Sequence, residues 1–195
     1  MSNIINGFTP LKTSDFTWYN QRSATSTDSA GGINLYAPDY TPDQGYTFTS
    51  LYKTAPSTPY KVIANMQYTY TWQAYVCWGL CWVENGGKSI NFMNMTRDTN
   101  KGIGRIACHY NSAPGTADQR WDYTGDYYPD IRWFQLEDDG TNRNMYISLD
   151  GVNWTLMKSE SRTNYCTPNQ VGICFSPYNQ IIYLSVNSFK IIYTG

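Results

Sequence analysis

Apolar and polar residues alternate along most of this chain with the period of two that is typical of β-strands. The clearest case is segment 62–72, in which every second residue is apolar or aromatic: Val62, Ala64, Met66, Tyr68, Tyr70 and Trp72. The pattern predicts a strand with one face toward a core and one wetter face.

Similar segments recur between clusters of Gly, Pro, Asn, Asp and Ser: 16–21, 33–38, 46–52, 74–84, 89–96, 104–111, 131–138, 144–149, 154–161, 171–176 and 183–193. The longest breaks, at 21–32, 37–45 and 112–118, are short enough to be loops inside one domain. About a dozen strands without helical periodicity predict an all-β sandwich or barrel.

The composition agrees with this fold class. The 195 residues include 18 Tyr and 7 Trp, and charged residues make up only 15%; aromatic residues suit strands. The 14 Lys and Arg are not clustered and are balanced by 15 Asp and Glu, so no nucleic-acid partner is expected. No apolar run approaches the roughly 18 residues of a membrane span, so no membrane insertion is expected.

The first residues of the chain indicate the cellular compartment in which the protein is made. Segment 1–16 lacks the charged and apolar regions of a secretory signal, which predicts synthesis in a cytoplasm. The five cysteines have no compact spacing pattern and are expected to be reduced thiols rather than a disulfide framework.

The segment 148–155, SLDGVNWT, contains the strongest turn signal. Asp150 and Gly151 stand between two apolar-alternating segments, where Asp-Gly is typical of a hairpin because both residues tolerate positive φ. Asn153 can extend the turn through backbone hydrogen bonds, and Trp154 can cover the hairpin end. We expect a structural turn here rather than a catalytic or metal site.

A second turn follows the densest acidic run. Glu137, Asp138 and Asp139 precede Gly140. Successive strand residues point to opposite faces, so these carboxylates cannot serve one substrate together from a regular strand, and a solvated turn is the default interpretation. A calcium ion bound between Glu137 and Gly140 stays an open alternative, because loop carbonyls could complete its oxygen shell.

Residues with metal-binding or catalytic chemistry are not arranged as a site. On a strand that stays regular through Gly79, Cys77 and Cys81 would lie roughly 13 Å apart, too far to share a metal. Zinc bound with Cys108 and His109 is therefore not expected unless the strand breaks at Gly79. His109 is the only histidine. The three glutamates, Glu84, Glu137 and Glu160, show no paired arrangement of the kind that glycoside hydrolysis requires. The sequence therefore predicts no enzyme activity and no cofactor, and it predicts no metal apart from the calcium alternative between Glu137 and Gly140.

The best binding candidate is the segment 120–133, RWDYTGDYYPDIRW. Its aromatic rings and carboxylates suit sugars, whose apolar faces pack on aromatic rings while carboxylates accept hydroxyl hydrogen bonds. The glycan-binding candidates are Trp121, Asp122, Tyr123, Asp126, Tyr127 and Tyr128. The alternative is that these rings belong to the core or to a subunit interface.

The order of several motifs resembles the concanavalin A-like lectin/glucanase superfamily. The resemblance rests on "FTWYNQRSATSTDSAGGINLYAP", "KTAPSTPYKVIANM", "VCWGLCW", "EDDGTN", "SLDGVNWT", "TPNQVGI" and "SVNSFKI", in that order, and covers roughly residues 16–191. It is strongest for jelly-roll modules of bacteriophage virion proteins and weaker for accessory domains of some β-xylosidases. It implies a two-sheet antiparallel jelly roll over residues 16–195, preceded by an arm, residues 1–15, that could dock onto a larger assembly.

The resemblance also implies a function. The expected protein is a non-enzymatic virion component, a capsid decoration or tail-fibre protein that contacts other virion proteins and forms a trimer or other cyclic homo-oligomer. Binding of a host-surface glycan is compatible with this role. The alternatives are a lectin-like glycan-binding module and, less favoured, a glycoside hydrolase. The glucanase motif Glu-x-Asp-x-x-Glu is absent from the sequence, so no catalytic residue is carried over.

Overall fold

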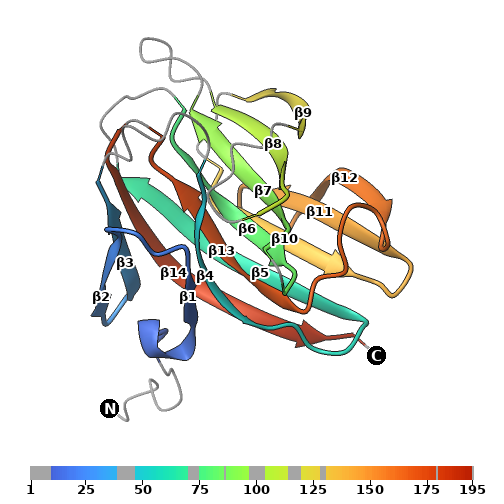
Figure 1. The fold of residues 1–195 in the computed structure, drawn as a ribbon, viewed down its shortest axis with the longest axis horizontal. Helices are drawn as coiled ribbons and strands as arrows, with labels where there is room; N and C mark the ends of the chain where they lie inside the picture. The colour runs from blue at the N-terminus through green and yellow to red at the C-terminus, as the bar shows by residue number, and fades with distance from the viewer. Residues whose placement is uncertain are drawn as a thin grey trace.

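The protein is a two-layer sandwich of antiparallel sheets, as predicted from the sequence (Figure 1). The computed structural model describes residues 10–38, 47–69, 75–85, 87–96, 104–113, 120–127, 131–178 and 180–194, and of residues 120, 121 and 123–127 it describes the backbone alone. Within these ranges the strands form two seven-stranded sheets. No helix in these ranges has the length and apolar character needed to cross a membrane.

Sheet A contains, in spatial order, β1 (Thr17–Tyr19), β4 (Thr49–Thr54), β13 (Gln170–Ser176), β6 (Cys77–Val83), β7 (Ser89–Thr96), β8 (Gly104–Asn111) and β9 (Arg120–Tyr127). Sheet B contains β12 (Thr155–Ser161), β11 (Asn142–Ser148), β10 (Trp133–Asp138), β5 (Tyr60–Thr69), β14 (Ile182–Tyr193), β3 (Gly32–Ala37) and β2 (Thr25–Ser29). The last two strands of the chain lie inside the sheets, β13 between β4 and β6 and β14 between β5 and β3. This interleaving of early and late strands gives the jelly-roll topology.

Two strands lie where the sequence pattern did not predict them. β2 falls in the predicted loop 21–32, because its residues Thr-Ser-Thr-Asp-Ser contain no apolar residue and therefore no alternation. It is an edge strand that pairs with β3. β9 falls within the aromatic segment 120–133, for which the sequence predicts a binding surface and no strand at the position of β9. By contrast, β7 and β8 have the predicted bounds, 89–96 and 104–111.

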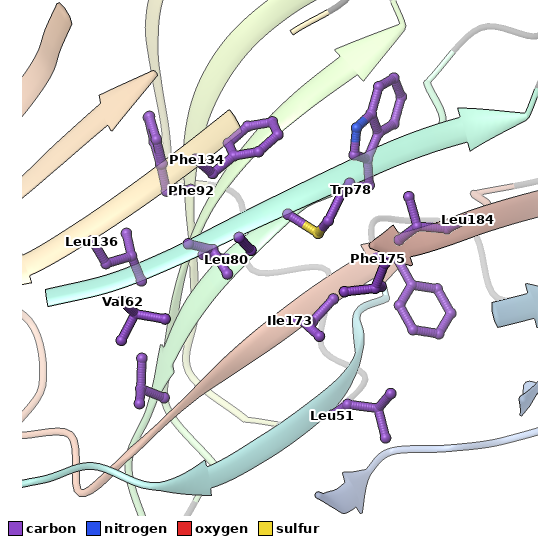
Figure 2. Packing of buried hydrophobic residues seen from close by; sticks show 14 of the residues in the cluster. Leu51, Val62, Trp78, Leu80, Phe92, Phe134, Leu136, Ile173, Phe175 and Leu184 are labelled. Atoms are coloured by element: carbon purple, nitrogen blue, oxygen red, sulfur yellow. The ribbon is translucent and has the colours of Figure 1, made fainter. Parts of the chain in front are cut away.

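The main core lies between the two sheets, and Figure 2 shows residues from both layers meeting there. In β5, Val62, Ala64 and Met66 are fully buried, as the alternation predicts; Tyr70 and Trp72 lie outside the described residues. Trp82 of sheet A donates its indole hydrogen to the Tyr60 hydroxyl of sheet B at 3.0 Å. Burial of these inward-facing side chains is what holds the layers together.

A second buried cluster lies on the other face of sheet A. Its members are Phe48, Cys77, Cys81, Val83, Met93, Met95 and Cys174. The ring of Phe48, which precedes β4, lies 5.2 Å from the ring of His109 on β8. Phe48 thus reaches over the intervening strands, so this face is filled by the chain's own side chains.

The expected arm is described only in part. Leu11 packs against the main core, and Thr13, in the short 3-10 helix η1 (Thr13–Asp15), donates from both its backbone nitrogen and its Oγ1 to Asp28 Oδ1 at 2.9 and 2.7 Å. Residues 10–15 therefore lie against β2 of the sandwich. Residues 1–9 are outside the described residues.

Candidate functional site

The predicted aromatic segment forms the edge strand β9 of sheet A. Its backbone register places Trp121 opposite His109, Tyr123 opposite Ala107 and Asp126 opposite Arg105. The structure does not describe the side chains of Trp121, Tyr123, Asp126 and Tyr127, and Tyr128 lies outside the described residues. The proposed glycan contacts of these residues therefore stay predictions.

Asp122 is the one candidate in this segment whose side chain is described. It forms a salt bridge with Lys158 of β12, which ties the edge of sheet A to the edge of sheet B. The Tyr110 hydroxyl lies 3.3 Å from Asp122 Oδ2 and 2.6 Å from Glu160 Oε2. Burial, together with the neighbouring thiol and carboxylates, raises the pKa of Tyr110 well above its usual value. Tyr110 therefore donates its proton in a hydrogen bond and does not ionise.

The carboxylates of the three glutamates have separate environments. Glu84 accepts a backbone hydrogen bond from Thr167 at 3.2 Å. Glu137 pairs with Lys61 at 3.1 Å on the outer face of sheet B. Glu160 points between the sheets, where 6% of its side chain is exposed, and it accepts a hydrogen bond from Asn164 at 2.9 Å. Glu160 and Asp122 share the Tyr110–Lys158 network, which links the two sheets.

The hairpin at Asp150 is organised by the side chain of that residue. Asp150 Oδ1 accepts hydrogen bonds from the backbone nitrogens of Val152 and Asn153, both at 2.8 Å, and from Ser148 Oγ at 2.9 Å. Asn153 Nδ2 donates to Oδ2 at 2.7 Å. These hydrogen bonds, those of the Asn153 and Val152 backbone first, lower the pKa of Asp150 far below its usual value.

The positive φ of this turn belongs to Gly151 alone, at 77°. Asp150 was expected to tolerate positive φ, but it is not among the described residues that adopt it. Its contribution is the carboxylate that accepts the turn's N–H groups. Trp154 is half-buried at the end of the hairpin.

The acidic turn distributes its carboxylates among separate partners. Asp139 Oδ1 accepts the backbone N–H groups of Thr141 and Asn142 at 2.8 and 2.6 Å, which lowers the pKa of Asp139. Asp138 pairs with Arg162 at 3.0 Å. Across the described ranges no group of three His, Cys, Asp or Glu side chains could hold a metal ion.

The thiols and the histidine are buried in the sandwich. All five cysteines are free and buried, and burial raises the pKa of Cys77 and Cys174 well above the usual thiol value. His109 is fully buried, and its Nδ1 lies 2.8 Å from Asn111 Oδ1. Cys77, Cys81 and Cys174 belong to the cluster on the filled face of sheet A, whereas Cys108 and Cys166 belong to the main core.

The outer face of sheet B carries a different surface at its β2 end. Paired residues on neighbouring strands form rows that run across β5, β14, β3 and β2, and two neighbouring outward-facing rows lie there. We call these eight residues the polar face; they are Thr69, Tyr183, Tyr36 and Thr25 in one row, and Gln67, Ser185, Asn34 and Thr27 in the other. None of the eight carries a charge at neutral pH, and all are exposed or half-buried.

Two tyrosines form the centre of the polar face. The ring centroids of Tyr36 and Tyr183 lie 5.0 Å apart with their planes inclined by 41°, and 54% of Tyr183 is exposed. In the adjacent row Ser185 Oγ donates to Asn34 Oδ1 at 2.8 Å, which fixes the orientation of that amide. Aromatic rings beside fixed amide and hydroxyl groups are suited to ligands that have both apolar faces and hydroxyl groups.

Sequence reasoning did not find the polar face. The residues come from four strands between positions 25 and 185, and only the strand order brings them together. The signal that could have revealed part of it is the alternation in β3, where Ile33 and Leu35 are buried and Asn34 and Tyr36 face outward.

Comparison with solved structures identifies the fold class. A functionally unknown protein from Saccharomyces cerevisiae matches with a TM-score of 0.71 and 14% identity over 94% of this chain and 99% of that chain. The GH43 protein BlXynB from Bacillus licheniformis matches with a TM-score of 0.59 and 10% identity over 83% of this chain and 33% of that longer chain. The carbohydrate-binding module CBM66 from Bacillus subtilis matches with a TM-score of 0.50 and 10% identity over 94% and 99%.

At these identities the likeness establishes a β-sandwich jelly-roll fold, found in carbohydrate-binding and carbohydrate-active proteins. No protein-family model and no curated protein matches the sequence.

Proposed function

We propose that the protein is a non-catalytic glycan-binding module that binds a neutral carbohydrate chain on the polar face. The observation that carries this proposal is the exposed pair Tyr36 and Tyr183, surrounded by uncharged amide and hydroxyl groups. Strands lie about 4.8 Å apart, so the face extends about 14 Å from β5 to β2, enough for an extended ligand. Its lack of charge favours neutral over anionic glycans.

The angle between the rings of Tyr36 and Tyr183 restricts the kind of glycan that can bind to both. Rings inclined by 41° cannot both lie flat against one planar surface, such as that of a crystalline polysaccharide. A single soluble chain whose successive sugars rotate can stack one sugar on each ring. The expected ligand is therefore a soluble, neutral glycan chain.

The absence of catalysis is part of the proposal. A retaining or inverting glycosidase needs two carboxyl groups on either side of an accessible scissile bond. The carboxylates of Asp122 and Glu160 are instead joined to Lys158 and Tyr110 between the sheets. The fold of CBM66, a carbohydrate-binding module, supports a binding role without enzymatic activity.

A glycan array followed by affinity electrophoresis tests the proposal. We expect binding to neutral soluble polysaccharides that is lost in Tyr183→Ala and Tyr36→Ala but kept in Tyr193→Ala. Tyr193 is a matched control because it is a 69%-exposed tyrosine near the other end of the same strand, β14. A folded protein with no carbohydrate ligand, or equal binding by all variants, would contradict the proposal.

The β9 segment is a second candidate surface for the same function. Trp121→Ala and Tyr127→Ala variants belong in the same experiment. If these variants lose glycan binding while Tyr183→Ala keeps it, the binding site lies on β9 and the proposed glycan-binding function still holds.

The proposed biological setting is the virion of a bacteriophage, as a decoration or fibre component that forms a cyclic homo-oligomer. This proposal rests on the ordered sequence motifs from Glu137 to Cys174. Immunogold labelling of particles should place the protein on the virion, and labelling confined to free host cytoplasm would contradict that setting.

A further inference from the structure

A pocket of about 340 Å³ lies beside the β11–β12 hairpin. Its apolar lining comes from Ile131, Ile147 and Leu149, and its polar lining includes Asp150, Asn153 and Thr155. Ile131 and Ile147 are 3% and 6% exposed, whereas Leu149 is 66% exposed. The pocket is therefore open to solvent and has an apolar, nearly buried inner wall, the usual character of a small-ligand site.

Asp150 lines this pocket, and hydrogen bonds within the turn hold its carboxylate in place. Three hydrogen bonds hold Oδ1, whereas Oδ2 accepts the single bond from Asn153 Nδ2. An ionised carboxylate has about four acceptor positions on its two oxygens, so Oδ2 can accept from a ligand as well. Because its hydrogen bonds already hold it, Asp150 loses little conformational entropy when a ligand binds.

The negative charge of Asp150 is not paired within the described chain. Its carboxylate forms hydrogen bonds with neutral donors, and no salt bridge to it is present among the described residues. A positively charged ligand would therefore gain charge pairing without displacing a basic side chain, and a charge-assisted hydrogen bond is stronger than a neutral one.

We propose that this pocket binds a small organic ammonium ion, with the ammonium group at Asp150 and an apolar ring or chain against Ile131, Ile147 and Leu149. The site is independent of the glycan proposal, since it lies at the β11–β12 end of sheet B and the polar face lies at the β2 end. Loss of one function leaves the other unaffected.

Proton–nitrogen correlation spectra of the full chain test this site. Cyclohexylamine is titrated at pH 7 and constant ionic strength, with cyclohexanol and cyclohexanecarboxylate as probes of the same ring without the positive charge. We expect saturable shifts confined to the amides of residues 147–155 with the amine, weaker shifts with the alcohol and none with the carboxylate. No saturation with the amine, or equal shifts with the carboxylate, would overturn the proposal.

A variant that fills the pocket provides a second test of the proposed ammonium site. Thr155→Phe adds a ring inside the pocket at an exposed position and should weaken amine binding at least about tenfold, or about 1.4 kcal/mol. Ser159→Phe, exposed on the same strand, is the control and should bind as the wild type does. Unchanged binding by Thr155→Phe would overturn the site. Tighter binding of Nα-acetyl-lysine amide than of cyclohexylamine would overturn the small-ligand assignment in favour of a lysine side chain.

Discussion

The hydroxyl of Tyr110 on β8 donates a 2.6 Å hydrogen bond to Glu160 Oε2 on β12. This bond joins a strand of sheet A to the edge strand of sheet B, beside the Asp122–Lys158 salt bridge. Asp122, one of the predicted glycan-binding residues of segment 120–133, therefore takes part in a polar connection between the two sheets.

Tyr110→Phe removes this connection. Glu160 loses a donor while it stays buried, so we expect the free energy of unfolding to fall by about 1–3 kcal/mol. Urea denaturation measures the change. Tyr193→Phe, at an exposed position, is the control and should stay within about 0.5 kcal/mol of the wild type. Equal stability of Tyr110→Phe and wild type would mean that the bond does not stabilise the sandwich.

Gly151→Ala tests the conformation of the hairpin. Gly151 has a φ of 77°, and an added Cβ would lie 2.8 Å from the Trp133 ring. Positive φ alone costs a residue with a Cβ about 1 kcal/mol, and contact with the ring adds to this. We expect a lower thermal midpoint together with a changed Trp133 environment in near-ultraviolet circular dichroism. A variant as stable as wild type would show that the turn adopts another conformation in solution.

The turn carboxylates predict a loss of stability in acid. Hydrogen bonds to the ionised forms lower the folded-state pKa values of Asp150 and Asp139 below the ordinary value of 3.8. Their contribution is therefore fully present above about pH 4 and is lost as the pH falls further. Urea midpoints at pH 7 and pH 3 should differ less in Asp150→Asn than in the wild type. The same difference in both proteins would argue against a role for Asp150.

The thiols should resist modification while the protein is folded. All five cysteines are buried, and burial raises the pKa of Cys166 to about 11, so little thiolate exists at pH 8. A thiol reagent such as DTNB should react slowly with the native protein and with five thiols after denaturation. Rapid native labelling of even one cysteine would contradict the buried arrangement.

Prediction from sequence succeeded where the local pattern determines the structure. β7 and β8 follow from alternating side chains. In the turn at Asp150 and Gly151, only Gly151 has a positive φ, and Asp150 acts through its carboxylate. β2 was missed because an exposed edge strand needs no apolar residues, and its pairing with β3 supplies the backbone hydrogen bonds. The polar face was missed because Tyr36 and Tyr183 become neighbours only through the pairing of β3 with β14.

The binding affinity of the Tyr183→Ala variant tests the central claim most directly. For the neutral soluble glycan that binds best, isothermal titration should show affinity weakened about tenfold or more, because the loss of ring contact costs about 1.4 kcal/mol. Tyr193→Ala should bind as the wild type does. Wild-type affinity in Tyr183→Ala would contradict binding at the polar face.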